Sequence, residues 1–503
     1  MNNWTICQQC QGHGKKSKRI RKKAKRCYEQ ELAEFEKNNQ NSAAPIPPKG
    51  HLENCANCKG SGLVDAANQQ ATESILAIEN YPHVAIIGGG IGGVALAVAC
   101  LHRQIPFTLY ERDSGFEVRS QGYGLTLQQA SRAIDGLGIF SLPDGVISTR
   151  HLVHTPEGKV VGTWGARHWA PSSAPLNTQH LSKRSNVHIA RQSLRQALLE
   201  QLGDHDSVRW GHQLVDVKKS DGSVELSFQV EGAEELYYAN ADLVVGADGI
   251  RSSVRKILLG DTATPLRYLD CIVILGICPL ADIAAIEVKS VDESSPDSLL
   301  ESLLDSATVF QTANGNERIY IMPYNSTSVM WQLSFPMPVQ DAKALSSQGA
   351  QALKEEAYRR CQWHFPIPQI LAATDATLVS GYPVYDRAPL EAEMLANVGP
   401  LTLIGDAAHP MSPFKGQGAN QALLDALALA RAITKNCRPM SKWQEKGIRE
   451  SLLTDFEIEM LQRTAIKVKH SAEAALFLHS DVVLHEGDEP RGRCLQRDEK
   501  VEN

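Results

Sequence analysis

The stretch VAIIGGGIGGVALAVACL, residues 84–101, decides the fold of this chain. Its apolar start predicts a buried strand, and the small residues at its end predict a helix. Between them Gly88, Gly90 and Gly93 follow the pattern G-x-G-x-x-G, and Glu111 ends the next strand-like run, PFTLYER. A strand, a glycine loop, a helix and a second strand with a terminal acid predict a βαβ unit that binds a dinucleotide.

Glycines at these positions let backbone N–H groups and the helix N-terminus approach a pyrophosphate, and the acid suits a ribose hydroxyl. Two other interpretations exist: the glycines could serve helix packing alone, and the stretch has the length of a membrane span. Five glycines within it argue against a span. The flanking strands and Glu111 favour dinucleotide binding over packing.

A second motif, GADGIRSSVRKIL at 246–258, begins where the apolar run of ADLVVGADG ends. Asp248 and Gly249 stand at the end of this predicted strand. A strand that ends in Asp-Gly is common in ordinary turns, so a turn and a ligand site both stay open for these two residues.

A third stretch, GDAAHPMSPFKGQGAN at 405–420, joins an apolar strand to the helical pattern QALLDALALARAI. Asp406 stands at the carboxyl end of the strand, where open α/β sheets place ligand groups. Pro413 stiffens the turn, and Gly416 and Gly418 allow close backbone contact. The helix that follows directs the positive end of its dipole toward the turn, which favours an anionic ring. We therefore expect this turn to hold a flavin.

The composition fits a globular protein. Of the 503 residues, 43% are hydrophobic and 21% are charged. These values favour two domains with appendages and exclude wholesale disorder and a membrane bundle. The first residues contain no apolar segment of the secretory type, so we expect a cytoplasmic protein. Residues 1–62 carry twelve Lys and Arg against five Asp and Glu, or +7, and the total of −6 therefore leaves −13 for the rest.

The sequence CQQCQGHG recurs as CANCKGSG, so that Cys7 and Cys10 form one CxxC pair and Cys55 and Cys58 form another. Two such pairs present four thiolates to one metal, and we expect a structural Zn²⁺ with these ligands. Free thiols on a flexible tail are the alternative. The repeat resembles the CxxCxGxG repeat of DnaJ-type chaperones, of which two of the usual four copies are present, without a J domain.

Between the pairs, KKSKRIRKKAKR at 15–26 holds nine basic residues in twelve. Such a run would neutralise phosphates of a nucleic acid. However, no aromatic residues are interleaved to stack on bases. A solvated helix followed by the acidic EQELAEFEK is the simpler interpretation. We expect no nucleic-acid partner, and a protein partner of this module stays open.

The glycine loop with Glu111, GADG and the 405–420 stretch, in this order, resemble the three fingerprints of class A flavoprotein monooxygenases, the aromatic-hydroxylase type. The resemblance covers about 83–470. Within the family it is nearest to the tetracycline-inactivating flavin monooxygenases, through YERD at 110–113, Arg119, ARQSLR at 190–195 and GQGANQALLDAL.

The resemblance implies cofactor roles for the matched residues. Glu111 would hold the adenosine ribose of FAD and Arg112 would lie by the adenine. Arg191 would contact the FAD chain, and Asp406 would bind the ribityl hydroxyls. The implied cofactor-binding set is completed by Gly88, Gly90, Gly93, Arg119, Asp248, Gly249, Pro413, Gly416, Gln417, Gly418, Ala419 and Asn420. Solvated surface charges are the alternative for the three arginines 112, 119 and 191.

The resemblance also implies an activity. In this family FAD is reduced by NAD(P)H and reacts with O2 to a flavin hydroperoxide, whose distal oxygen passes to the substrate. The implied enzyme is an FAD- and NAD(P)H-dependent monooxygenase of a small aromatic or polyketide-like compound. Phe414 would face that substrate, and no catalytic side chain is assigned. A flavin-dependent reductase or dehydrogenase, and an interaction protein with a flavin sensor domain, are the alternatives. We expect a small molecule and O2 as partners, and no membrane.

The expected fold class is α/β: a Rossmann-like FAD-binding domain with an inserted β-rich substrate domain, C-terminal helices and a small N-terminal zinc-knuckle module. Within it we expect a hairpin at 208–230 that turns at Asp221-Gly222. The expected boundaries are a cysteine-rich module at 1–62, a linker at 63–82, the FAD-binding domain at 83–265 (with the start of the substrate sheet) and 386–440, the substrate domain at 266–385, helices at 441–480 and a disordered tail at 481–503.

Overall fold

The structure is a computed structural model that describes residues 4–18, 20, 22–37, 52–68, 81–118, 123–166, 186–203, 205–220, 223–284, 303–437 and 441–491. Arg119, the turn at 221–222 and the connector at 38–50 lie outside the described residues, and so do residues 492–503.

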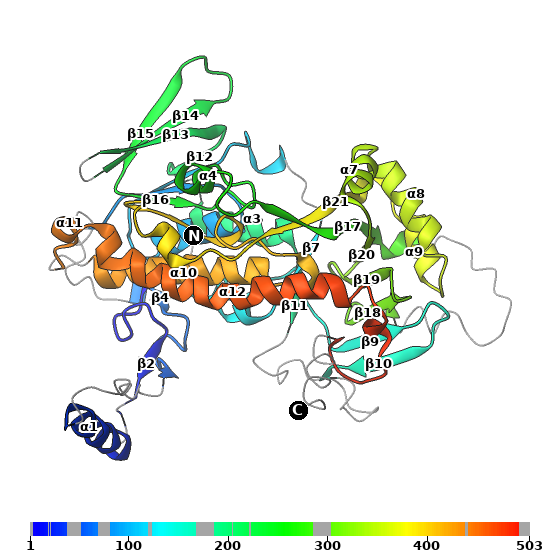
Figure 1. The fold of residues 1–503 in the computed structure, drawn as a ribbon, viewed down its shortest axis with the longest axis horizontal. Coiled ribbons are helices and arrows are strands. Elements are labelled where there is room, and N and C mark those ends of the chain that lie inside the picture. The colour runs from blue at the N-terminus through cyan, green and yellow to red at the C-terminus, as the bar shows by residue number, and fades with distance from the viewer. Residues whose placement is uncertain are drawn as a thin grey trace.

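A parallel sheet forms the centre of the larger part of the molecule (Figure 1). Its strands run in the order β12 (Val208–Arg209), β6 (Phe107–Tyr110), β5 (Val84–Ile87), β16 (Leu243–Gly246) and β22 (Leu401–Leu403), and every neighbouring pair is parallel. Every residue of β5, β16 and β22 is buried. These strands are continuously apolar because both faces of the sheet are covered.

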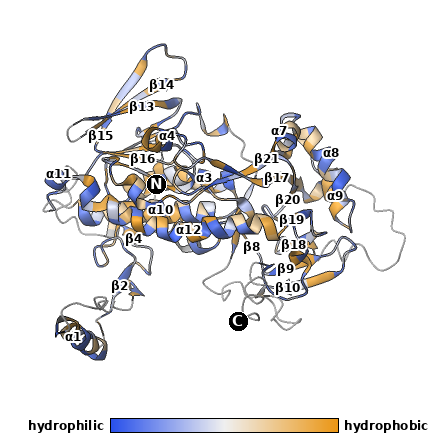
Figure 2. Cartoon of the chain, in the orientation of Figure 1, coloured by the Kyte–Doolittle hydropathy of each residue, from blue (hydrophilic) through white to orange (hydrophobic). Residues whose placement is uncertain are grey.

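The helix α2 (Ile91–Leu101) packs on β5 and β6, and the helices α3 (Arg191–Leu202) and α10 (Gly418–Asn436) pack against α2. In α2, nine of the eleven residues are buried. Residues 84–101, which have the length of a membrane span, are therefore a buried strand followed by a buried core helix, as the glycine motif predicted. A fourth helix, α12 (Thr454–Phe477), runs alongside α10, and hydrophobic and hydrophilic residues alternate along both (Figures 1 and 2).

A seven-stranded sheet forms the second large layer. Its order is β10 (Val160–Trp164), β9 (Arg150–His154), β18 (Thr308–Ala313), β19 (Arg318–Pro323), β20 (Ser328–Pro336), β17 (Leu266–Pro279) and β21 (Val379–Arg387). Only the β18–β9 pair is parallel among these neighbours. The strands β9 and β10, at 150–164, belong to this sheet although they precede the predicted substrate domain at 266–385. The prediction places the start of the substrate sheet within 83–265.

Short helices cover one face of the seven-stranded sheet. They are α5 (Leu280–Ala284), α7 (Val339–Ser347), α8 (Ala350–Arg360) and α9 (Ile367–Ala373). Trp331 and Phe335 of β20 share a core with Leu353 of α8 and Ile370 of α9. Part of the opposite face lines the cavity described below.

Two smaller sheets complete this part of the molecule. The strands β13 (His212–Ser220) and β14 (Ser223–Val230) pair antiparallel, as the predicted hairpin requires, and β15 (Leu236–Ala241) adds a third strand. The other sheet joins β7 (Gly124–Leu127), β11 (Val187–Ala190) and β8 (Val146–Ile147). The short helix α4 (Ser253–Leu259) follows the GADG motif.

The described residues of the N-terminal module form two strand pairs and one helix. The pairs are β1 (Trp4–Ile6) with β4 (Leu63–Asp65), and β2 (Lys15–Ser17) with β3 (Leu52–Asn54). The basic run divides between β2 and the helix α1 (Lys22–Lys37), so it is a helix only from Lys22 onward. Figure 1 shows α1 projecting from the rest of the molecule.

The C-terminal region contains α11 (Trp443–Lys446), a π-helical turn at Arg449–Leu453, α12 and a 3₁₀ turn at Asp481–Leu484. The expectation of a disordered tail from 481 is wrong for residues 481–491. Arg491 is buried and its Nε donates to the Val483 carbonyl at 2.8 Å, while an Nη donates to the Val161 carbonyl of β10. In the described parts of the chain, we find no helix with the length and apolarity needed to cross a bilayer.

Candidate flavin site

The glycine loop between β5 and α2 has a geometry that only glycine permits at two positions. Gly88 has a φ of +108°, in the region that side chains rarely adopt. A Cβ on Gly93 would lie 1.9 Å from the Gly88 carbonyl oxygen. At Gly90, by contrast, a Cβ would meet only an Arg191 Nη atom at 4.0 Å. The loop therefore closes tightly on itself through Gly88 and Gly93 and leaves Gly90 at the cavity.

Glu111 lies beside this loop, as predicted. Its carboxylate is buried and accepts hydrogen bonds from the backbone N–H of Gly89 at 2.6 Å and of Asp113 at 3.0 Å. Arg195 holds the other side of the loop, since its Nε donates to the Gly89 carbonyl at 2.7 Å. Arg112 is exposed.

The turn after β22 presents Asp406. Its carboxyl faces the cavity and is open to solvent there, although protein surrounds it on the other sides. Burial by this surrounding protein raises the pKa of Asp406, and His409 and Arg191 offset only part of that rise. Arg255 of α4 fixes the turn from behind, because one Nη donates to the carbonyls of Ala407 at 2.8 Å and Ala408 at 2.9 Å.

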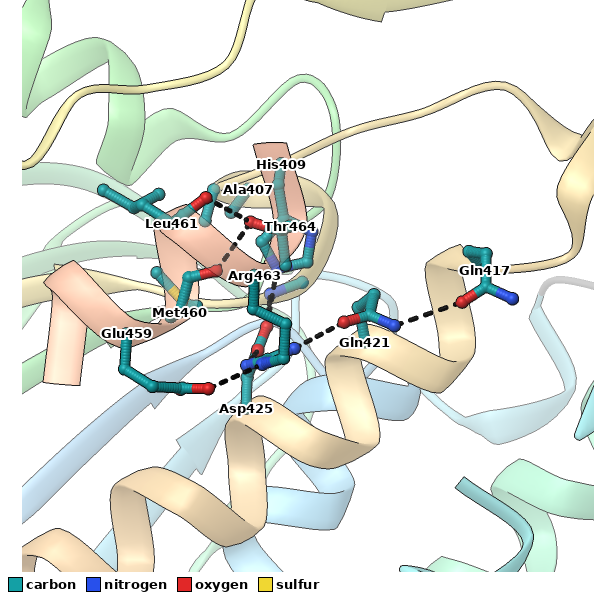
Figure 3. A network of polar contacts seen from close by, with 12 residues as sticks. Ala407, His409, Gln417, Gln421, Asp425, Glu459, Met460, Leu461, Arg463 and Thr464 are labelled. Carbon is teal, nitrogen blue, oxygen red and sulfur yellow. Dashed lines mark hydrogen bonds and ion pairs between the residues drawn. The ribbon is translucent and has the colours of Figure 1, made fainter. Parts of the chain in front are cut away.

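A buried polar network ties this turn to α10 and α12 (Figure 3). One oxygen of Asp425 contacts His409 Nε2 at 2.6 Å and accepts from the Gly405 N–H at 3.0 Å. The other oxygen accepts from Arg463 Nη2 at 2.8 Å. Burial favours a raised pKa for Asp425, but His409 and Arg463 outweigh it and the pKa is lowered. Through Gln421 the network reaches Gln417, at the end of the turn.

The second half of the 405–420 stretch leads into α10. Gly416 adopts a φ of +59°, and Gln417 Nε2 donates to Gln128 Oε1 at 2.6 Å. Asn420 is fully buried: its Oδ1 accepts from the N–H groups of Gln128 and Ala130, and its Nδ2 donates to the carbonyls of Thr126 and Gly416. Asn420 therefore fastens the turn to the segment after β7.

A cavity of about 580 Å³ lies between these loops and the seven-stranded sheet. The predicted residues that line it are Gly90, Arg191, Gly249, Asp406, Pro413, Phe414, Gly416, Gln417, Gly418 and Ala419. Those that do not line it are Gly88, Gly93, Glu111, Arg112, Asp248 and Asn420.

Asp248 faces the start of α4 and not the cavity. Its carboxylate accepts from the Ser252 hydroxyl and from the backbone N–H groups of Ser253 at 2.7 Å and Val254 at 3.3 Å. These bonds fasten the motif to the start of α4, whose N-cap is Ser252. Asp248 therefore makes contacts typical of a turn and Gly249 lines the cavity, while a cofactor role for the two residues stays a prediction.

The sheet supplies the other wall of the cavity. Alternate residues of β19 and β20 face it, among them Tyr320, Met330 and Gln332. His151 and His188 also line it, and burial lowers their pKa values to about 4 and about 3. Both imidazoles are therefore neutral at physiological pH. The wall combines apolar and aromatic side chains with several polar ones, which can orient a small molecule.

The four predicted cysteine ligands also come together. Their sulfur atoms all lie within 4.8 Å of one another, with Cys7 and Cys55 Sγ 3.9 Å apart and Cys10 and Cys58 Sγ 3.6 Å apart. A tetrahedral zinc with Zn–S bonds of about 2.3 Å would place its sulfurs about 3.8 Å apart. The N–H groups of Gly14 and Gly62 point at Cys10 and Cys58 Sγ, at 3.2 and 3.3 Å.

Comparison with known proteins identifies the family. A protein family described as FAD binding domain matches residues 81–275 and 280–442. The chain belongs to this family. The resemblance to class A flavoprotein monooxygenases is thereby confirmed, and the protein is an oxidoreductase that uses FAD.

Individual flavoproteins resemble the chain over most of its length. The aurachin C monooxygenase/isomerase of Stigmatella aurantiaca is 27% identical over 382 residues, which are 74% of this chain and 86% of that protein. The structure of Klebsiella pneumoniae HpxO complexed with FAD and uric acid superposes with a TM-score of 0.62 at 20% identity, over 84% of this chain and 93% of HpxO. Tetracycline destructase Tet(51) gives a TM-score of 0.53 at 18% identity, over 84% and 97% of the two chains.

The described residues of this FAD-binding protein fit the cofactor. The glycine loop at the start of α2 offers N–H groups to a pyrophosphate, Glu111 lies where a ribose is expected, and Asp406 faces the cavity. Sequence reasoning missed Arg195, Arg255 and Asp425, which hold the loops in place. Their common signal is a charge inside an otherwise apolar helical pattern, which alone does not name a partner.

Proposed function

We propose that this flavoprotein uses NAD(P)H and O2 to insert one oxygen atom into a small aromatic or polyketide-like compound. The observation that carries the proposal is the cavity itself, which has Asp406 and the α10 N-terminus on one side and a sheet wall of apolar, aromatic and polar side chains on the other. Bound FAD supplies the redox chemistry and the activation of oxygen. The chain's own residues bind the cofactor, orient the substrate and exclude water.

The residues divide these tasks by position. Asp406 would accept hydrogen bonds from hydroxyl groups of the FAD chain, and Arg191 lines the cavity beside Tyr123, with its guanidinium 5.5 Å from the ring centre. Pro413 and Phe414 line the cavity from the turn between Asp406 and α10. Phe414 packs edge-on against His479, at 5.5 Å between ring centres, and this contact fixes the surface offered to a planar substrate.

The relatives support the substrate class. One is named for aurachin C, one solved structure holds uric acid, and another protein is a tetracycline destructase. A cavity that combines aromatic side chains with polar groups suits compounds of this planar kind.

The proposal predicts incorporation of oxygen from O2. Purified protein loaded with FAD should oxidise NADPH faster with one member of a panel of phenolic and polyketide-like compounds. With ¹⁸O2 the product should gain one heavy oxygen. Asp406→Ala should weaken FAD binding roughly ten- to hundredfold, because it loses hydrogen bonds to a charged group. The control is Asp261→Ala, an exposed carboxylate paired with Lys256, and it should leave FAD affinity unchanged.

Two results would count against the proposal. NADPH oxidation with substrate turnover but no heavy oxygen in any product would identify a reductase on the same fold. Equal FAD affinity of the Asp406 and Asp261 variants would remove Asp406 from the cofactor site.

We also propose that the four cysteines hold one structural zinc ion. The surroundings of the cluster supply an argument beyond its shape: Arg103 and Arg431 both donate to the Gly12 carbonyl, at 3.4 and 3.2 Å. Arg103 is buried, and within the described residues neither guanidinium forms an ion pair with a carboxylate. A zinc ion with four thiolates has a net charge of −2, which these two cations balance.

Metal analysis tests the zinc site. The purified chain should carry about one zinc per molecule, as four-cysteine sites do. Cys55→Ser should lose the zinc and expose residues 4–68 to protease, because the metal contributes the folding energy of such small modules. Cys27→Ser is the matched control, since Cys27 is an exposed cysteine of the same module outside the cluster. Full zinc content in the Cys55 variant would refute the ligand set.

The remaining expectations stay proposals. The ten cysteines of the described chain form no disulfide bonds. These thiols are compatible with the cytoplasmic location expected from the sequence. The exposed strand β2 and helix α1 offer a surface for a protein partner of the N-terminal module.

A further inference from the structure

A buried arginine stands in the sheet wall of the cavity. Arg318 begins β19, is 5% exposed and lines the cavity together with Tyr320 and Met322, the next residues on the same face of the strand. Its guanidinium lies 4.9 Å from the centre of the Tyr320 ring. Arginine is seldom buried unless another group pairs with its charge, so the groups around Arg318 decide how its charge is balanced.

Within the described chain, no group balances the charge of Arg318. Arg318 Nε donates to Gln311 Oε1 at 2.6 Å, and this neutral amide is its one hydrogen-bond acceptor among the described residues. No described carboxylate lies within ion-pair distance of Arg318. Burial lowers the pKa of Arg318 to about 10, which still leaves it charged at neutral pH. A buried charge without a counter-charge costs several kcal/mol unless a ligand supplies one.

The cofactor side of the cavity does not supply that charge. Among the described residues that line it, the one carboxylate is Asp406, which lies in the turn after β22 and interacts electrostatically with Arg191 and His409. Lys415 is another cationic side chain that lines the cavity. It lies 5.1 Å from the Phe477 ring centre and interacts with Glu473. Among the described residues, Arg318 is thus the cation of the sheet wall, on the side where the substrate is proposed to bind.

We infer that the substrate carries an acidic group, a carboxylate on a planar ring, and that the two Nη groups of Arg318 bind it. A guanidinium matches a carboxylate with two parallel hydrogen bonds, and Gln311 on Nε leaves the Nη edge free for this. Tyr320 beneath the guanidinium fixes its plane. The acid thereby sets the orientation of the ring in the cavity. This inference rests on the proposed monooxygenase function and names its substrate class.

Binding of matched acid and amide pairs tests the inference. The probes are hydroxybenzoates and quinoline-2-carboxylate, each beside its carboxamide, titrated into FAD-loaded protein and followed by the flavin absorbance change. The acids should bind the wild-type protein roughly ten- to hundredfold more tightly than their amides, the range of hydrogen bonds to a charged group. Arg318→Gln should abolish this preference, and Arg318→Lys should retain part of it because it keeps the charge.

Arg360→Gln is the matched control. Arg360 is also a shielded arginine over an aromatic ring, 3.8 Å from the Phe335 centre, but it pairs with Glu317 and Glu356 and does not line the cavity. Its loss should leave the acid preference intact even if stability falls.

The outcomes separate the two proposals. Wild-type protein that binds amides as tightly as acids overturns the inference, and so does an Arg318→Gln variant that keeps the preference. The proposed function fails by a different measurement, namely absence of FAD or of NADPH oxidation in the wild type. If Arg318→Gln does not load FAD, the wild-type comparison of acids with amides and the Arg318→Lys variant still decide.

Discussion

Asp425→Ala should destabilise the folded flavoprotein by about 3–5 kcal/mol, the usual loss when one partner of a buried ion pair is removed. Asp425 has no exposed surface, and its carboxylate joins His409, Arg463 and the Gly405 N–H. Without it, the Arg463 charge and the buried His409 side chain lose their main partner. Denaturant unfolding of the FAD-loaded protein measures the loss. FAD should also bind more weakly, because Gly405 precedes Asp406.

The control for this prediction uses the same arginine. Glu459 accepts from Arg463 Nε at 3.0 Å, but its side chain is 58% exposed. An exposed pair contributes only about 0–1 kcal/mol, so Glu459→Ala should be nearly neutral. Equal losses for the two variants would show that the network in Figure 3 does not stabilise the turn.

The pKa shift of Asp425 adds a pH signature. Since its pKa is lowered in the folded protein, Asp425 stabilises the fold fully above its unfolded pKa of about 3.9, and this stability is lost as the pH falls through the lower folded value. The difference in unfolding free energy between wild type and Asp425→Ala should therefore fall once the pH is lowered below about 3.9. A difference that disappears near pH 6 would contradict this assignment.

The local motifs of the cofactor site could be predicted because each is a short-range feature. Gly93 is a glycine for a steric reason within the loop itself, since a Cβ there would lie 1.9 Å from the Gly88 carbonyl oxygen. The place of Asp406 at the cavity could be predicted because the residue stands at the end of a strand. The two CxxC pairs likewise predict one four-sulfur cluster. In such cases residue type and spacing carry the geometry.

Other features depend on contacts between distant segments. The sequence places Arg318 in an ordinary strand, and only the pairing of β18, β19 and β20 turns its side chain toward the cavity. The parallel pairing of β9 with β18 links residues about 150 positions apart. For Asp248 the motif is visible in the sequence, but the direction of its side chain is not. The sequence therefore does not specify whether the carboxylate binds a ligand or accepts from N–H groups at the start of α4.

Gly93→Ala should have an effect at least as large as Asp425→Ala, because its cause is a clash with backbone. The added Cβ would lie 1.9 Å from the Gly88 carbonyl oxygen and 3.3 Å from Ala247 Cβ. Neither the buried helix α2 nor the buried strand β5 has room to move apart without opening the core. We expect a loss of more than about 4 kcal/mol or failure to fold, a size reserved for such specific mechanisms.

Gly90→Ala is the control within the same loop. Its added Cβ would face the cavity and meet only an Arg191 Nη atom, at 4.0 Å, and Gly90 has a φ of −74° that alanine adopts easily. This variant should fold with a thermal midpoint close to that of the wild-type protein in the absence of FAD, while its cofactor affinity falls because the methyl group occupies the approach to the loop. The pair separates two reasons for glycine in one motif: Gly93 is required by the packing of α2 on β5, and Gly90 by the ligand. If both variants fold equally well without FAD, the close contact between Gly93 and Gly88 is not a constraint on the fold. The motif would then be explained by cofactor binding alone.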